Sequence, residues 1–196
     1  MEVMKESIDA IIGNIREAEE LLTGEDINNF LDVLRKSKSI FVTGAGRSGL
    51  VSKAFAMRLM HLGFSAYVVG ETISPAITSG DCILAISGSG ETSNIVSAAK
   101  ISKELGAYVL AVTSYPESTL GKLADGKVLV KGRTKLEVDD EDYLKRQISG
   151  NYTLLTPLGT AFELTSLVFL DALVSELMSA MDVTEDDLKA RHTNLE

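Results

Sequence analysis

An apolar run that stops abruptly in glycines and small hydroxyl residues constrains the fold of this sequence more than any other feature. Cys82–Ile86 has the length and apolar continuity of a strand buried on both faces, and residues 87–92 follow it as Ser-Gly-Ser-Gly-Glu-Thr. Thr92 is a natural N-cap for a helix over 93–105. Because glycines allow close approach of the backbone and a helix start offers unpaired amides, the segment predicts a cradle for an anion that needs no lysine.

A second unit of the same kind lies earlier in the chain. Residues 39–43 are predicted to form a strand, and Gly-Ala-Gly-Arg-Ser-Gly at 44–49 leads into a helical run over 50–62. Two such units are typical of an open parallel sheet, which gathers its loops around one ligand at the carboxyl ends of its strands.

The first loop opens a locally basic stretch in an acidic protein. The net charge of −9 argues against a nucleic-acid partner, yet residues 44–61 contain Arg47, Lys53 and Arg58 and no acid. Arg47 can neutralise a bound phosphate, and a salt bridge to Glu91 or another acid is an equal alternative. Lys53 and Arg58 are more simply explained as solvated charges on a helix.

Two other interpretations of these loops stay open at this point. A link rich in Ser and Gly between a strand and a helix is often only a tight turn. The first loop also spells G-x-G-x-x-G, and Glu71 follows where the ribose-binding acid of a dinucleotide site is expected. Neither loop has the lysine of a Walker A motif.

Strands and helices alternate through most of the chain. Apolar residues at three- and four-residue spacing predict a helix over 1–22, and a second helix over 27–35 leads to the first strand. Further strands are predicted at 65–69, 107–112 and 127–130, and further helices at 118–123 and 158–178. The fold class is therefore α/β, a three-layer α/β/α sandwich around a five-stranded parallel sheet with right-handed crossovers.

Composition favours a single domain. With 196 residues, 45% of them hydrophobic, the chain can bury one sizeable core. Cys82 is the only cysteine and is expected in that core, so no disulfide forms within the chain. We expect a cytoplasmic protein, because no signal peptide or charge-free transmembrane run is evident. Residues 132–151, with an acidic cluster at 137–142, are expected to form an exposed connection.

Helix-start signals mark the last quarter of the chain. The Thr-Pro pair at 156–157 predicts the N-cap and first residue of the long apolar helix, with Glu163 in its early turns. Residues 184–187, Thr-Glu-Asp-Asp, predict a capping box for a last helix that carries Arg191 and His192.

Together these segments resemble the sugar isomerase (SIS) domain family, and within it the hexulose-phosphate isomerase branch. The segments that carry the resemblance lie at 44–49, 56–63, 70–72, 86–92, 157–163 and 191–196. The Ser-Gly-Ser-Gly-Glu-Thr segment is characteristic of SIS domains as a class, whereas the helix ending in His61 and the segment at 157–163 indicate the branch. The resemblance implies one flavodoxin-like SIS domain over 1–196, with an N-terminal helical extension and a C-terminal helix.

The resemblance also implies a function. It implies interconversion of 3-hexulose 6-phosphate and fructose 6-phosphate, as in the ribulose monophosphate pathway of formaldehyde fixation, without metal or organic cofactor and in a homotetramer. It implies that the phosphate is held by Ser48, Ser87, Ser89 and Thr92. The predicted phosphate site also includes Gly46, Arg47 and Gly88 of the same two loops. Glu91 is expected to turn away from the anion and bond backbone or an arginine.

Moving a ketone from C3 to C2 requires a base for the carbon-bound proton and an acid for the oxygens of an enediol. Glu163 is the predicted base; it is expected too far past Pro157 for the helix dipole to matter, in apolar surroundings. The alternative is a carboxylate that only pairs with an arginine. His61 is the predicted acid, with His192 as the alternative, because the chain has only these two histidines. One of them is expected to reach a neighbouring subunit's site.

Two rival functions remain. Another aldose-ketose sugar-phosphate isomerase, such as one for a pentose phosphate, would have the same cradle. A non-catalytic SIS module that binds a sugar phosphate as a sensor is the other. The sequence argues against the sensor, because it contains neither a DNA-binding helix pair nor a second domain to regulate.

Overall fold

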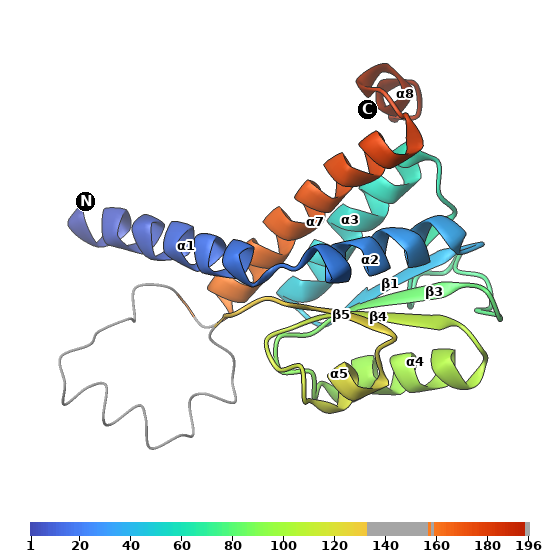
Figure 1. The fold of residues 1–196 in the computed structure, drawn as a ribbon, viewed down its shortest axis with the longest axis horizontal. Helices are drawn as coiled ribbons and strands as arrows, with labels where there is room; N and C mark the ends of the chain where they lie inside the picture. The colour runs from blue at the N-terminus through green and yellow to red at the C-terminus, as the bar shows by residue number, and fades with distance from the viewer. Residues whose placement is uncertain (133–156, 158, 195–196) are drawn as a thin grey trace.

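A five-stranded parallel sheet forms the centre of the protein (Figure 1). The computed structural model describes residues 1–132, 157 and 159–194. The strands are β1 (Ile40–Gly44), β2 (Ala66–Val68), β3 (Cys82–Ile86), β4 (Tyr108–Thr113) and β5 (Gly126–Leu129). Their spatial order is β2-β1-β3-β4-β5, and every neighbouring pair is parallel. The predicted parallel sheet is confirmed, with the strand order of flavodoxin-like folds.

Helices cover both faces of this sheet. They are α1 (Glu2–Leu21), α2 (Gly24–Lys36), α3 (Arg47–Leu62), α4 (Ser93–Glu104), α5 (Thr119–Leu123), α7 (Thr160–Met181) and α8 (Glu185–Ala190). In Figure 1, α2, α3 and α7 lie above the sheet and α4 and α5 below it. α1 packs on α7 and points away from the sheet, while α8 contacts α3. The predicted three-layer sandwich is confirmed.

Alternation of side chains along the strands divides the core into two halves. Leu84 and Val112 face α2, α3 and α7, whereas Ile83 and Ala111 face α4 and α5. Cys82 lies fully buried in the first half, and burial raises the pKa of its thiol, as expected for a core cysteine.

α7 is long and apolar enough, by length and composition, to cross a membrane. Here it packs against α1, α2 and α3 and buries Phe169, Leu173 and Leu177 in the core. A helix covered on several sides needs apolar residues around most of its circumference. Packing within the domain therefore covers part of this apolar surface, while Val168 stays 45% exposed.

The predicted start of this helix was wrong. α7 begins at Thr160, after Gly159 in the left-handed conformation with φ 86°, and Pro157 lies before the helix. Glycine adopts this conformation without strain, so the helix starts three residues after the expected position. Thr156 and residues 133–151 of the predicted charged connection lie outside the described residues.

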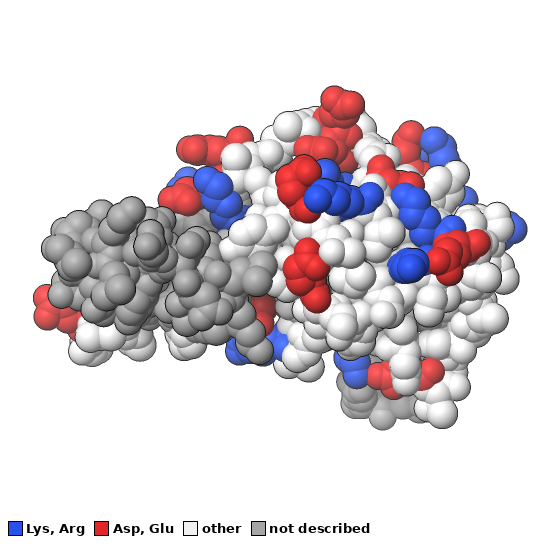
Figure 2. Space-filling model, turned by 90° about the horizontal axis from the view of Figure 1, so that it is seen from below, with Lys and Arg blue, Asp and Glu red and all other residues white. Residues whose placement is uncertain are grey.

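Charged side chains of both signs are interspersed on the face seen from below in Figure 2. Among the charged side chains of the domain, Lys103 Nζ of α4 lies 3.0 Å from Asp125 Oδ1. The acidic and basic side chains drawn on this face are mixed rather than separated into two fields.

Candidate active site

Two loops meet at the carboxyl ends of β1 and β3. These strands are neighbours, with Gly44 opposite Ile86, so the loops that lead to α3 and α4 start side by side. α3 covers one face of the sheet and α4 the other, which makes this pair the switch point of the topology (Figure 1). Ligands of open parallel sheets bind in the crevice outside such a point. The fold thus brings together the two loops that the sequence singled out.

Hydroxyl groups line the second loop. Ser87 is buried, and its Oγ accepts a hydrogen bond from the Gly90 amide at 3.2 Å and lies 3.3 Å from Thr92 Oγ1. Ser89 Oγ accepts from the Glu91 amide at 3.2 Å. The serine oxygens therefore hold the loop in shape, while a hydroxyl hydrogen can still be donated to an anion.

Three helix starts near the two loops, those of α3, α4 and α7, lack side-chain caps. Thr92 is the N-cap of α4, as predicted, but its hydroxyl accepts no bond from a helix amide, and the N-caps of α3 and α7 are Gly46 and Gly159. Side-chain caps are present on α2, α5 and α8, from Thr23, Ser118 and Thr184. Uncapped N-terminal amides carry partial positive charge, which favours an anion at this edge.

The other phosphate-site residues of the sequence analysis lie in the same two loops. Ser48 is buried in the first turn of α3, directly after Arg47. The Gly88 carbonyl accepts a hydrogen bond from the Ser114 amide at 3.0 Å, which ties the second loop to the end of β4.

The Glu91 carboxylate turns away from the loop hydroxyls, as predicted. It accepts hydrogen bonds from the amide and the hydroxyl of Thr119, at 2.7 and 2.8 Å, and these bonds lower the pKa of Glu91, the amide bond most. Gly90, with φ 65°, reinforces the same junction through its carbonyl, which accepts from the Leu120 amide at 3.0 Å. A Cβ on Gly90 would lie 1.9 Å from Ser118 Oγ, so the junction requires glycine.

Glu163 lies in the first turn of α7 and accepts a hydrogen bond from Arg47 Nε, at the start of α3. The expectation that the helix dipole is remote from Glu163 was wrong, because α7 begins later than predicted. The pairing with an arginine, which the sequence left open as the alternative to a catalytic role for Glu163, is present. Only 13% of the Glu163 side chain is exposed, against 59% for Arg47.

Two further acids near α3, Glu71 and Asp171, form ion pairs with basic residues of that helix. Glu71, the candidate for a ribose contact, lies 2.6 Å from Lys53 Nζ, and Asp171 lies 3.8 Å from Arg58 Nε. Within residues 1–132, 157 and 159–194, no group of three or more His, Cys, Asp or Glu side chains could hold a metal ion.

The two histidines lie together at the far end of α3. Their rings stack with centroids 5.0 Å apart, and Arg191 Nη1 donates to the His61 carbonyl at 3.0 Å. α8 has its predicted capping box but ends at Ala190, so His192 lies beyond the helix rather than on it. His61 is 3% exposed; burial lowers its pKa most, followed by His192 and Arg58.

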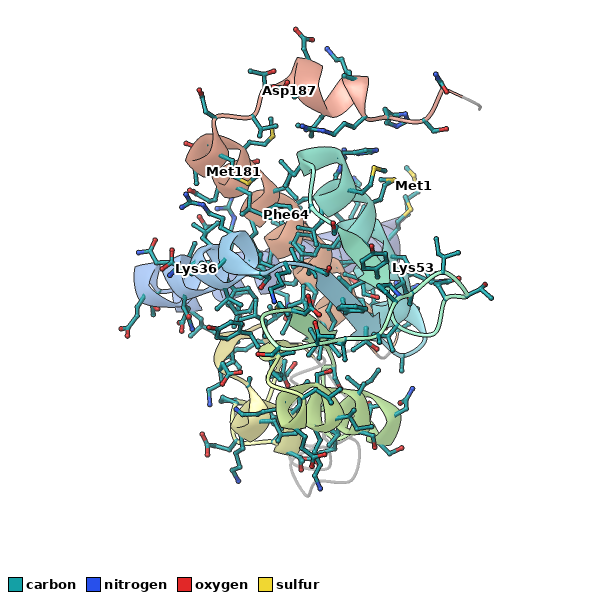
Figure 3. The ribbon with its side chains drawn as sticks, turned by 90° about the vertical axis from the view of Figure 1, so that its right-hand side faces the viewer. Met1, Lys36, Lys53, Phe64, Met181 and Asp187 are labelled. Atoms are coloured by element: carbon teal, nitrogen blue, oxygen red, sulfur yellow. The ribbon has the colours of Figure 1, made fainter. Side chains whose placement is uncertain are left out.

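This histidine pair is remote from Glu163 of the same chain. His61 follows Arg47 by fourteen residues, which at 1.5 Å per residue places it about 21 Å away along α3. In Figure 3, α8 with Asp187 lies beyond the end of α3, which Phe64 follows. The structure therefore separates the predicted base from both predicted acids within one chain.

Comparison with known proteins decides the family. Residues 33–135, just over half of the chain, match the family model described as SIS domain. The chain belongs to the SIS domain family. The two loops predicted to form the anion cradle, at the β1–β3 switch point, lie within this matched region.

Relatives of this SIS domain protein carry a specific name. The 3-hexulose-6-phosphate isomerase of Bacillus subtilis is 37% identical, over 97% of this chain and 98% of that protein. The protein of the same name from Methanocaldococcus jannaschii is 36% identical, over 97% of both chains. A crystal structure from Methanococcus jannaschii, of a hypothetical protein with that inferred function, superposes with a TM-score of 0.80 at 32% identity, covering 96% of this chain and 98% of the other.

Proposed function

We propose that this protein is a 3-hexulose-6-phosphate isomerase, which interconverts 3-hexulose 6-phosphate and fructose 6-phosphate through an enediol. The relatives of that name, aligned over nearly the whole chain, support the substrate. The observation that carries the chemistry is that the most sheltered acid at the site, Glu163, pairs with Arg47 of the first loop, so a carboxylate stands beside the proposed phosphate cradle.

The phosphate is held in this proposal by neutral groups and one arginine. Two uncapped helix starts provide amides, and the hydroxyls next to them donate hydrogen bonds. The proposed ligands are Gly46, Arg47, Ser48, Ser87, Gly88, Ser89 and Thr92. The double variant S87A/S89A should lose most of its affinity for fructose 6-phosphate. An affinity that titration calorimetry finds unchanged would contradict the assignment of these serines.

Glu163 is proposed as the base. Its carboxylate takes the proton from C2 of the 3-hexulose, which leaves an enediol between C2 and C3, and returns a proton to C3 as the ketone forms at C2. An acid must meanwhile protonate the oxygen at C3 while the hydroxyl at C2 gives up its proton. No redox partner is needed, because the electrons move only within the sugar.

The acid is proposed to come from the histidine pair of a neighbouring subunit. A span of about 21 Å along α3 is too long for one sugar to reach both Glu163 and His61 of one chain. His61 remains the proposed proton donor, and His192, whose ring stacks on it, is the alternative. We further propose a cytoplasmic homotetramer in which residues 1–196 form one SIS domain.

Hydrogen exchange tests this function directly. Incubation of fructose 6-phosphate in deuterium oxide with the protein should place deuterium on C3 of fructose 6-phosphate and on C2 of the 3-hexulose formed from it, and none on C1. E163Q should abolish the exchange while still binding the sugar phosphate. Binding without exchange in the native protein would favour a sensor, and exchange with pentose phosphates alone would favour a different isomerase.

A further inference from the structure

We propose that Arg47 couples capture of the phosphate to release of the base. Without substrate its guanidinium holds Glu163; when the sugar's phosphate enters the cradle, the guanidinium turns to the phosphate and frees the carboxylate. This inference rests on the proposed function, because it assigns Glu163 as the base and the two loops as the phosphate site.

The position of Arg47 allows it to serve both anions. It is the first residue of α3, directly after Gly46, so its backbone belongs to the loop at the end of β1. β1 pairs with β3, and Gly44 faces Ile86, the residue before Ser87. The side chain crosses from this loop to the start of α7, where it meets Glu163. In this proposal, a change of side-chain rotamer moves the Arg47 guanidinium from Glu163 to the phosphate site.

Exposure identifies which partner moves. The Arg47 side chain is largely exposed, whereas the Glu163 side chain is mostly enclosed. Water and salt around the exposed guanidinium weaken its attraction to the carboxylate. A phosphate dianion has more charge than a carboxylate and suits the planar fork of arginine, so it competes well for the guanidinium.

The other acid near the cradle does not compete for Arg47. Both oxygens of Glu91 accept hydrogen bonds from Thr119, which directs this carboxylate toward α5. While Glu163 Oε2 accepts the hydrogen bond from Arg47 Nε, that oxygen is engaged and less able to take a proton from carbon. Departure of the guanidinium therefore makes the carboxylate available at the moment the substrate is anchored.

A thermodynamic cycle tests the coupling. Affinity for fructose 6-phosphate is measured by titration calorimetry in the native protein, E163Q, R47A and R47A/E163Q. If Glu163 and the phosphate compete for Arg47, E163Q should bind the ligand roughly three- to tenfold more tightly when Arg47 is present and less than about twofold more tightly when it is absent. R47Q replaces R47A if circular dichroism shows that R47A is unfolded.

Asp171 provides a matched control. It also lies on α7 and pairs with an arginine of α3, Arg58, so D171N makes the same charge change away from the cradle. D171N should leave the affinity within about twofold of the native value. An equal gain from E163Q in both backgrounds would mean simple charge repulsion, and the absence of a gain would mean that Arg47 bridges both anions; either result overturns the coupling.

The same cycle with inorganic phosphate separates this inference from the proposed function. Phosphate occupies the cradle whichever sugar the protein transforms. An Arg47-dependent gain for phosphate without any hydrogen exchange on fructose 6-phosphate would support the competition and reject the isomerase. Exchange without an Arg47-dependent gain for either ligand would support the isomerase and reject the coupling.

Discussion

The Glu91 carboxylate accepts hydrogen bonds from both the amide and the hydroxyl of Thr119, at 2.7 and 2.8 Å. This contact joins the cradle loop after β3 to the start of α5 after β4. Two neighbouring crossovers of the sheet are thereby fixed to each other at the proposed phosphate site. Glu91 thus fixes the position of the proposed phosphate loop, and its carboxylate bonds Thr119 instead of facing the loop hydroxyls.

Loss of this contact should weaken substrate binding more than turnover. In E91Q the amide cannot accept both hydrogen bonds, so the loop loosens and the KM for fructose 6-phosphate should rise roughly three- to tenfold, as expected for about one lost hydrogen bond. The kcat should change little. E117Q, which removes an equal charge two residues before Thr119, is the control. An unchanged KM in E91Q would show that the loop keeps its shape without Glu91.

Replacement of Gly90 by alanine should damage both stability and binding. A side chain disfavours the φ of 65°, and its Cβ would overlap Ser118, so G90A should lower the free energy of unfolding by about 1–3 kcal/mol. G13A is the matched control: the added methyl on α1 meets nothing within 4 Å, and the free energy of unfolding should rise by about 0.5–1 kcal/mol. Urea unfolding measures both; equal stability of G90A and the native protein would contradict the prediction.

Acid should destabilise the fold through His61. Burial first, then His192 and Arg58, keep its pKa below the ordinary value of 6.5. As the pH falls below 6.5, His61 of the unfolded chain binds a proton. His61 of the folded chain binds one only at a lower pH, because its pKa is lowered. The free energy of unfolding therefore decreases between these two pKa values. H61Q should show a flatter dependence in urea unfolding.

The comparison is best made above about pH 5, where Glu91 and Asp187 remain ionised in both the folded and the unfolded chain. These acids have lowered pKa values, and their stabilisation is lost only at lower pH. Parallel pH dependences of H61Q and the native protein would exclude His61 as the source.

Mixed subunits should recover activity. E163Q lacks the base and H61Q/H192Q lacks both acids, so each variant should be inactive by itself. Co-expression in equal amounts should restore activity at about a quarter of the sites if base and acid come from different chains, because half of the chains supply each group. The readout is isomerisation of fructose 6-phosphate by purified mixed oligomers. Failure to recover any activity would contradict a shared site.

Apolar patterning predicted the sheet well. Each strand lies within one residue of its expected start, because an apolar run between helices leaves little freedom in a parallel sheet. The two loops proposed to bind the anion were recognisable for the same reason, because each follows such a run. The start of α7 was not predicted correctly. The left-handed conformation of Gly159 depends on tertiary context, and the Thr-Pro pair before it is itself typical of a helix start.

The sequence did not predict the contacts between side chains that are far apart along the chain. It left Arg47 with a choice between Glu91 and another acid, and nothing in the spacing of residues 91 and 119 indicates their contact. Stacking of His61 with His192 depends on how the end of the chain crosses α3. Such contacts are set by packing between elements rather than by local pattern.

In the shared-site mechanism, the length of α3 means that only the assembled oligomer can catalyse the reaction, because the base and the acid come from different subunits. Subunits that dissociate on dilution would keep their fold and still bind the phosphorylated end of the sugar. They would stop turning it over once they came apart. Specific activity should therefore decline with dilution well before any ligand-binding signal does.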